Sequence, residues 1–381
     1  MAAVSGRALA ASARRAGFVP LIADFFADAD TRQIAPSCYR LDDLKAGFRW
    51  KSLAPALEAL AEASPSPLLG VVYGSGFEDR PALLAEIAGR WPLLGNGPSV
   101  VMRVKTPEIF FAELARLGIP HPRTVMDPDA AGSGWLAKRQ GGAGGSHIVT
   151  SHVVRSHVGV ASTARRRAAK GRTYFQEKVE GRPVSALFAG TGTSACVLGF
   201  SEQWAAPTSC AKWRYGGAAR PAELSRGLET RLTDSVERVA ERFSLKGLGS
   251  ADFLLNGEDF YLLEINPRPG ATLDIFDSEA DPLLRIHLEA MLDNRLPTAL
   301  RNLPAATAAA IVYATEPITV SQTMIWPDWT ADRPRIGERI DKDRPICTVW
   351  ARSTTKVEAR RLIDERIASV LAACTGREGG T

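Results

Sequence analysis

The residues with the clearest chemical potential lie shortly after position 250. Asp252 is followed by a turn and then by Glu264, Asn266 and Arg268, which stand two positions apart. Because side chains of a strand alternate between its faces, Glu264 and Asn266 project to one side, and a hairpin can bring Asp252 beside them. Two carboxylates and an amide oxygen suit Mg²⁺, with Mn²⁺ as an alternative. Arg268, two positions after Asn266, faces the same side and offers N–H donors to phosphoryl oxygens. The alternative is a salt-bridged hairpin without a metal.

A second group of residues could hold phosphate. It is the run Lys138-Arg139-Gln140-Gly141-Gly142-Ala143-Gly144-Gly145-Ser146. A lysine can neutralise phosphate oxygens, and the glycines let backbone N–H groups approach them without side-chain clashes. The run is not a Walker loop, which would end in Gly-Lys-Ser or Gly-Lys-Thr. A flexible linker has the same composition, but the place of this run between two apolar segments favours a phosphate loop.

A third segment could bind the edge of a nucleobase. Residues 173–188 have strand character and contain the polar stretch Gln176-Glu177-Lys178-Val179. An extended linker offers backbone C=O and N–H groups to an adenine ring. The alternative is a plain exposed strand end.

Elements of alternating type must position these residues. In the first hundred residues, the pattern predicts helices at 5–16, 52–63 and 81–90, and strands at 19–24 and 68–73. This alternation indicates a parallel sheet with helices on both faces. Residues 2–4 are too short for the usual first strand of a nucleotide-binding fold.

Beyond residue 100 the pattern changes. It predicts helices at 105–117, 224–243 and 282–292, and a hairpin of strands 251–255 and 260–265. Short apolar runs follow at 309–312, 324–326 and 346–350, before a terminal helix at 356–373. We therefore predict an α/β and α+β protein with a parallel-sheet domain over 1–100, a main domain over 101–300 and a small β-rich segment over 301–381.

Composition places the chain among soluble globular proteins. Its 381 residues are 45% hydrophobic and 23% charged, and they fit about two or three domains. No apolar run reaches the roughly 20 residues of a membrane helix. Residues 1–23 favour a helix and a strand over a targeting segment. The cysteines (Cys38, Cys196, Cys210, Cys347 and Cys374) are scattered without a CxxC pair, which indicates reduced thiols in a cytoplasmic protein.

The charge pattern indicates an anionic ligand but not nucleic acid. The net charge is +5, and the basic residues are spread along the chain with few aromatic residues among them. The densest cluster, Arg165-Arg166-Arg167 with Lys170 and Arg172, is interpreted as a solvated loop or helix end.

In this order and at these separations, the three motifs resemble the ATP-grasp superfamily, which includes D-alanine–D-alanine ligase and biotin carboxylase. The resemblance covers about residues 100–295 and implies two lobes, at about 120–180 and 181–300, that clamp ATP. It implies that Lys105 and Lys138 contact ATP phosphates and that Gly141–Ser146 is the phosphate loop. Glu177 and Val179 would bind adenine through their main chain, Asp252, Glu264 and Asn266 would hold the metal, and Arg268 would act in catalysis.

The carboxylate–amine ligase branch of the family implies the reaction. A carboxylate, for example of glutamate, becomes an acyl phosphate that an amine attacks, releasing ADP and phosphate. Lys212 or Arg214 would hold the substrate anion, although a surface loop with a stacked cation–aromatic pair fits Lys212–Gly217 equally well. Ser75, Glu78, Asp79 and Arg80 are candidates for the acceptor site. Pro183 stands where several members have a ribose-binding Glu, which leaves Glu180 as a weak candidate. The partners expected are small molecules, with neither nucleic acid nor membrane, and a homodimer is left open.

Two other classes fit parts of the sequence. Gly74-Ser75-Gly76 after a predicted strand motivates an NAD(P)-binding oxidoreductase, but a full GxGxxG and its distant acidic residue are missing. The basic composition motivates a non-catalytic protein that binds a nucleotide or RNA. The oxidoreductase leaves Asp252, Glu264 and Asn266 without a role. The same cluster argues against a protein that only binds a nucleotide, and the scattered charge argues against one that binds RNA.

Overall fold

The computed structural model describes residues 1–150, 172–301 and 303–375, and the basic cluster at 165–170 lies outside them. The N-terminal segment contains the expected parallel sheet. β1 (Leu21–Asp24) pairs in parallel with β2 (Ser37–Arg40). Ala2 bridges Tyr73 and Ala23, and Val71 bridges Leu93, all in parallel. The first strand is thus reduced to a bridge, because too few residues precede the first helix.

The predicted strand at 68–73 was wrong in its extent. Only Val71 and Tyr73 form bridges, whereas Leu68 and Leu69 are 40% and 48% exposed. These two leucines therefore precede the sheet, and an apolar run alone did not reveal where pairing begins. Four helices pack around this sheet: α1 (Arg7–Arg15), α2 (Ala29–Ile34), α3 (Trp50–Glu62) and α4 (Pro81–Ala88).

The helix predicted at 105–117 is present over residues 107–116, and a second short helix that was not predicted precedes it. α5 (Pro98–Lys105) ends where α6 (Pro107–Arg116) begins, and Thr106 between them is extended, with φ −92° and ψ 110°. The residue before a proline is disfavoured in helical geometry, so Pro107 breaks the run. As a result Lys105 lies at the C-terminal end of α5 instead of at the start of a helix.

A small antiparallel sheet carries the glycine-rich loop. Its strands lie in the order β3-β6-β4-β5, and the loop joins β4 to β5. Trp135, Ala137 and Phe175 form its apolar core. The bounds are β3 (Thr124–Val125), the 3₁₀ turn η1 (Pro128–Ala130), β4 (Leu136–Arg139), β5 (Ile148–Thr150) and β6 (Thr173–Gln176).

An eight-stranded sheet forms the centre of the molecule, in the order β11-β10-β7-β8-β9-β12-β16-β14. Its last three strands come from the C-terminal segment, which therefore continues this sheet. The bounds are β7 (Arg182–Thr191), β8 (Ala195–Ala205), β9 (Tyr215–Arg220), β10 (Lys246–Asn256), β11 (Asp259–Asn266), β12 (Ala306–Tyr313), β14 (Thr330–Ala331) and β16 (Pro345–Ser353). A separate pair joins β13 (Ile318–Thr319) to β15 (Arg339–Ile340).

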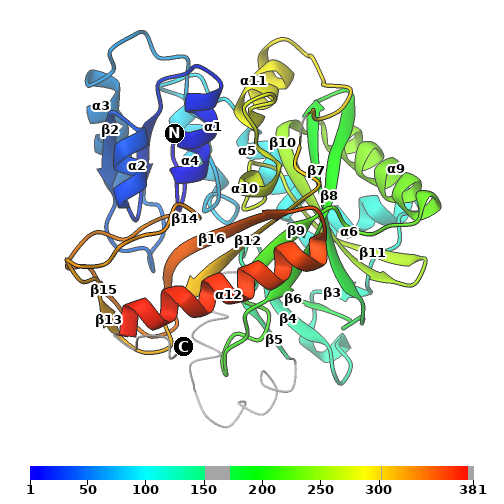
Figure 1. The fold of residues 1–381 in the computed structure, drawn as a ribbon. Helices are drawn as coiled ribbons and strands as arrows, with labels where there is room; N and C mark the ends of the chain where they lie inside the picture. Colours follow the sequence, from blue (N-terminus) through cyan, green and yellow to red (C-terminus); the bar gives the residue numbers. More distant parts are fainter. Residues whose placement is uncertain (151–171, 302, 376–381) are drawn as a thin grey trace.

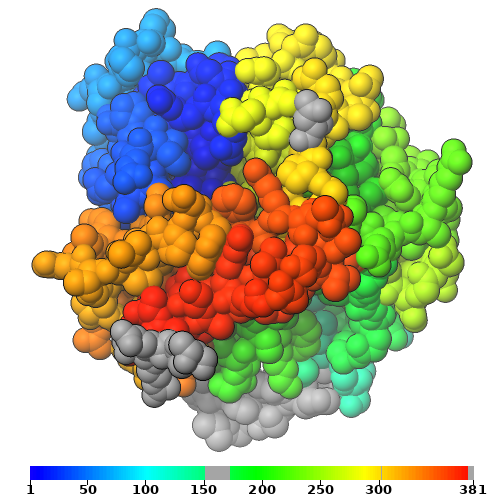
Figure 2. Space-filling view, viewed as in Figure 1, coloured from blue at the N-terminus to red at the C-terminus, as the bar shows by residue number. Residues whose placement is uncertain are grey.

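Helices cover the sheet on both faces. α9 (Arg226–Phe243) is capped at its N-terminus by Ser225, whose side chain accepts a hydrogen bond from the Leu228 N–H, and it packs on β7 and β8. α10 (Leu273–Phe276) and α11 (Leu283–Leu292) lie beside the N-terminal segment, and α12 (Lys356–Thr375) packs against β12 and β16. Figure 2 shows the C-terminal residues as a band between the N-terminal residues and the central ones. Among the described helices, none has both the length and the apolar character of a membrane span.

Buried polar side chains tie the N-terminal segment to the rest of the fold. Arg7 forms ion pairs with Asp274 (2.5 Å) and Asp332 (2.9 Å). Asn96 Nδ2 donates to the carbonyl oxygens of Lys246 (2.9 Å) and Pro267 (3.0 Å). Because Pro267 lies between Asn266 and Arg268, the N-terminal segment directly supports the chain that carries the predicted metal ligands.

Candidate active site

The β10–β11 hairpin brings the predicted metal ligands together. Asp252 lies opposite Glu264 in the strand register. Asn266 Nδ2 donates to Asp252 Oδ2 at 3.0 Å, and Ser185 Oγ donates to Asp252 Oδ1 at 2.6 Å. Ser185 was missed as a site residue. It lies opposite Asp252 on β7, and a prediction of the β7–β10 register would have found it.

The two carboxylates respond differently to their surroundings. Burial, and next the charge of Glu264, raise the pKa of Asp252 to about 6. Burial also acts to raise the pKa of Glu264. The neighbouring Lys105, and then His147 and Lys138, act in the opposite direction and hold the pKa of Glu264 below its usual value. Two partly buried carboxylates in register repel each other, and a divalent cation between them would relieve that repulsion.

This donor set fits Mg²⁺. Within the described ranges, no group of three or more His, Cys, Asp or Glu side chains could hold a metal ion. Asp252 and Glu264, with the Asn266 amide, instead provide the small number of protein ligands that Mg²⁺ takes when phosphates and waters complete its shell.

Both predicted lysines lie at this cluster. Lys105 Nζ lies 3.1 Å from Glu264 Oε2 and 3.0 Å from Asn266 Oδ1. Lys138 Nζ donates to Gln176 Oε1 at 2.6 Å, and burial lowers its pKa to about 8. Each ammonium group is buried at a place where phosphate oxygens would need a cation.

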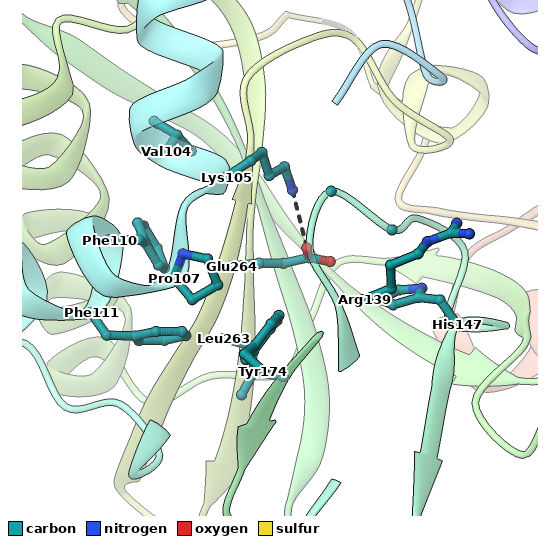
Figure 3. Close-up of a pocket in the computed structure, with 12 residues that line it drawn as sticks. Val104, Lys105, Pro107, Phe110, Phe111, Arg139, His147, Tyr174, Leu263 and Glu264 are labelled. Carbon is teal, nitrogen blue, oxygen red and sulfur yellow. Dashed lines mark hydrogen bonds and ion pairs between the residues drawn. The ribbon is translucent and has the colours of Figure 1, made fainter. Parts of the chain in front are cut away.

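A pocket joins the cluster to an apolar wall (Figure 3). Its polar side includes Lys105, Glu264, Arg139 and His147. Burial lowers the pKa of His147 to about 4, so this imidazole is neutral at pH 7. Its apolar side, which the sequence pattern did not predict, consists of Val104, Pro107, Phe110, Phe111, Tyr174 and Leu263. This surface has the character that the flat face of a nucleobase requires.

The predicted adenine-binding stretch lies between β6 and β7. Gln176 is buried, whereas Glu177 and Lys178 are exposed and Val179 is half-buried. The Glu177 N–H donates to Arg123 O at 2.8 Å. Glu180 forms an exposed ion pair with Lys178. The geometry therefore does not support Glu180 as the residue that binds ribose.

The glycine loop lies against the chain on both sides. A Cβ on Gly141 would come within 2.7 Å of Asp79 Cα, and one on Gly145 within 1.7 Å of Trp213 O. The Tyr215 N–H donates to Gly144 O at 3.1 Å. Glycine is therefore required at positions 141 and 145 for close approach, while Ser146 is exposed.

Replacing Gly145 by alanine should open this loop. Gly145→Ala places a side chain on a backbone with φ +72° and also brings the new Cβ into a clash with Trp213 O. Gly144→Ala introduces only the backbone strain, because φ is +69° there and no atom lies within 4 Å of the new Cβ. That strain costs about 1–2 kcal/mol at either position. We expect a nonspecific protease to cut residues 141–146 faster in Gly145→Ala than in Gly144→Ala, with the cuts mapped by mass spectrometry. Equal rates would contradict the observed docking of the loop.

The remaining predicted site residues, Arg268, Arg214 and Lys212, lie in different surroundings. Arg268 is buried and pairs with Glu78 at 2.7 Å, which joins it to the N-terminal segment. Arg214 lies 3.6 Å from the centre of the Tyr313 ring and donates to Asp343 O at 3.0 Å, so its guanidinium is engaged away from the metal ligands. Lys212 is exposed, and no ion pair of the described residues includes it.

The glycines that motivated an oxidoreductase have a packing role. A Cβ on Gly74 would lie 2.8 Å from Ala3 Cβ, and one on Gly76 would lie 2.7 Å from the Phe48 ring. Close packing explains both residues without a dinucleotide.

A family model described as an ATP-grasp domain matches residues 109–272. An uncharacterized protein of Methanocaldococcus jannaschii is 26% identical over 181 residues, covering 48% of this chain and 43% of that protein. The chain thus spans less than half the length of that relative.

Solved structures share the whole fold. The biotin carboxylase domain of 2-oxoglutarate carboxylase from Hydrogenobacter thermophilus, solved with MgADP and bicarbonate, has a TM-score of 0.71 at 12% identity, covering 96% of this chain and 89% of that one. N5-carboxyaminoimidazole ribonucleotide synthetase from Thermus thermophilus has a TM-score of 0.66 at 17% identity, covering 100% of both chains. These likenesses confirm the predicted fold class.

Proposed function

We propose, from the ATP-grasp domain that residues 109–272 form, that this chain is an ATP- and Mg²⁺-dependent carbon–nitrogen ligase. The domain confirms the resemblance that the motifs carry. In the proposed reaction, a carboxylate oxygen attacks the γ-phosphorus of ATP and ADP leaves. An amine then attacks the acyl phosphate, phosphate leaves, and the amine nitrogen loses a proton.

The observation that carries this proposal is the set of charges at the polar end of the pocket. Asp252 and Glu264 lie in register, and Lys105 and Lys138 lie beside them. Phosphoryl transfer requires positioning and neutralisation of charge more than a protein nucleophile. Mg²⁺ held by Asp252, Glu264 and Asn266 would neutralise phosphate oxygens, and the two lysines would hold the nucleotide in place.

The apolar side of the pocket supports a purine nucleotide. Phe111, Tyr174 and Leu263 offer a surface for the base, and the adjoining stretch Gln176–Val179 offers main-chain donors and acceptors to its edge. Arg268, fixed by Glu78, is proposed to stabilise the charge on the transferring phosphoryl group.

For the substrates we propose an amino acid such as glutamate as the carboxylate and a small amine as the acceptor. Lys212 is the better candidate to hold the carboxylate, since Arg214 is engaged by Tyr313 and Asp343. Glu78 and Asp79 lie against Gly141 of the glycine loop. With Ser75 and Arg80, they are proposed for the acceptor site. A cytoplasmic protein without nucleic-acid or membrane partners fits the scattered charge. A homodimer is proposed by analogy with the dimeric biotin carboxylase domain.

The products of the nucleotide test the proposal. With a panel of carboxylic acids, we expect ADP and phosphate, and a hydroxamate when hydroxylamine replaces the amine. Glu264→Gln should lose both products, whereas Asp259→Asn, an exposed change on the same hairpin, should retain them. Release of AMP, or ADP formation that no carboxylate stimulates, would rule out the acyl phosphate.

A further inference from the structure

Two arginines and a threonine lie in one row across three neighbouring strands of the central sheet. Thr307 on β12 is paired with Arg220 on β9 and also with Arg352 on β16. Residues paired across strands face the same side of a sheet, so the three side chains share one face. The three strands lie next to one another in Figure 1. The pairing therefore places the Thr307 hydroxyl between two guanidinium groups.

The first of these arginines is buried without an acidic partner. Arg220 is only 5% exposed. Its Nε donates to Ile275 O, and its Nη2 donates to Thr307 Oγ1 at 3.1 Å. Both acceptors are uncharged, and none of the ion pairs among residues 1–150, 172–301 and 303–375 includes Arg220. A buried charge usually has a partner of opposite sign, because it has lost its contacts with water. Arg220 therefore lacks a counter-charge.

The second arginine adds another positive charge beside the first. Arg352 is exposed, and its guanidinium carbon lies 5.1 Å from the centre of the Trp350 ring. Within the described part of the chain, no ion pair includes Arg352 either. Burial, and next the charge of Arg352, lower the pKa of Arg220 to about 10, so the two guanidinium groups lie near enough for their charges to interact. A bound anion would offset this repulsion.

Hydrogen-bond donors remain available in this row. Arg220 Nη1 has no hydrogen-bond partner among the described residues, and it is not among the enclosed polar atoms that lack one. Thr307 Oγ1 accepts from Arg220, which leaves its own hydrogen free to be donated. Guanidinium groups match the oxygens of phosphate in geometry and charge. Two guanidinium groups and a hydroxyl group suit a tetrahedral dianion.

This row is separate from the pocket of the candidate active site. None of its three residues lines the pocket that Figure 3 shows. β7 and β8 lie between β9 and β10, the strand of Asp252, so about 14 Å separates the two strands. The row nevertheless contacts α10 through Ile275 O, and the preceding Asp274 pairs with Arg7 of the N-terminal segment at 2.5 Å.

We propose that Arg220, Thr307 and Arg352 form a second anion site, which binds a phosphate group outside the pocket, either as inorganic phosphate or as a small phosphomonoester. The inference goes beyond the proposed function and does not depend on it, because the site shares no residue with the pocket. Its occupant neutralises the guanidinium that holds the end of α10.

The test measures the melting temperature against the concentration of inorganic phosphate or of glycerol phosphate. Sodium chloride keeps the ionic strength constant, and each series is run with and without a nonhydrolysable Mg–ATP analogue. A ligand that binds only the folded protein raises the melting temperature, which gives its apparent Kd. We expect Arg352→Ala to weaken this Kd about tenfold, the loss of one charge-assisted contact. Arg352→Lys should recover part of the loss.

A matched control separates the site from net charge. Arg231 is exposed, lies 5.2 Å from the centre of the Phe260 ring and is likewise outside the ion pairs of the described residues. Arg231→Ala should leave the Kd unchanged. Thr307→Val removes the hydroxyl group but keeps the shape of the side chain. It should weaken the Kd less than Arg352→Ala does, and it tests the site if Arg352→Ala does not fold.

The two probes identify the source of the phosphate group. Tighter binding of glycerol phosphate would indicate a phosphomonoester, and tighter binding of inorganic phosphate would indicate the free ion. No stabilisation of the unmodified protein, or an equal Kd in Arg352→Ala, would overturn the inference. So would a loss of the effect when the Mg–ATP analogue is present, which would place phosphate in the pocket, and a loss in Arg231→Ala as large as that in Arg352→Ala. Tighter binding of a polyglutamate peptide that Arg352→Ala abolishes would make this row a docking surface for an acidic protein instead.

Discussion

Asp252→Asn should reduce turnover at saturating Mg–ATP by about 100-fold or more, a loss of roughly 2.7 kcal/mol in transition-state stabilisation, and yet melt close to the unmodified protein. The substitution removes one of two carboxylates that lie in register at the proposed metal site. Burial and the charge of Glu264 already disfavour the ionised form of Asp252, whose pKa is raised to about 6. A neutral amide therefore relieves repulsion in the folded protein while removing a proposed metal ligand.

The raised pKa of Asp252 explains why Asp252→Asn is expected to cost little stability. A carboxyl group whose pKa is raised on folding lowers stability at pH values above its unfolded pKa, so replacing it should cost little there. Release of ADP is measured beside thermal melting, with Asp259→Asn as the control, because Asp259 is exposed at the start of β11. Turnover near that of the control would show that Asp252 holds no metal.

Arg268→Ala should lower the free energy of unfolding by about 3–5 kcal/mol, as expected when one partner of a buried ion pair is removed. The side chains of Arg268 and Glu78 are 9% and 3% exposed. Burial acts to raise the pKa of Glu78, but Arg268 and then Lys105 hold it below the usual value. Without the guanidinium, the Glu78 carboxylate is left buried with its charge poorly compensated.

A double substitution separates stability from activity. Glu78→Leu with Arg268→Met replaces both charges by apolar groups, so we expect it to recover much of the stability lost in Arg268→Ala but none of the turnover. Unfolding in urea and release of ADP are the two measurements. Arg339→Ala breaks an exposed pair with Asp341 and should cost at most about 1 kcal/mol. Similar losses in Arg268→Ala and Arg339→Ala would mean that the buried pair does not hold the N-terminal segment in place.

The grouping of Asp252, Glu264 and Asn266 could be predicted because its geometry is local. Strand alternation gives the facing of Glu264 and Asn266, and a short turn sets the hairpin that brings Asp252 opposite Glu264. The glycine loop could also be predicted, because its glycine-rich composition and the strand before it are local features of the sequence. In both cases residues close in sequence determine the contact.

What the sequence did not reveal depends on distant contacts. Glu78 was proposed for an acceptor site, but its link to Arg268 joins residues far apart in the chain. Phe110 and Phe111 look like ordinary core positions of an amphipathic helix, and only the packing of α6 against β11 and β6 makes them part of the pocket wall. No local periodicity specifies that packing, nor does it specify that β12 and β16 join the central sheet.

Because the C-terminal strands belong to the central sheet, they limit where the chain can be cut into shorter fragments. β12 covers the hydrogen-bonding edge of β9 through Thr307–Ala310, and β9 itself consists largely of glycine and alanine. A fragment that ended at residue 272, where the family match ends, would expose this edge as a flat row of unpaired backbone groups with little side-chain protection. Such edges recruit strands from other chains and promote aggregation. The central sheet and its C-terminal strands are therefore one unit of solubility, and any trimming for expression or fusion has to keep β12 in place.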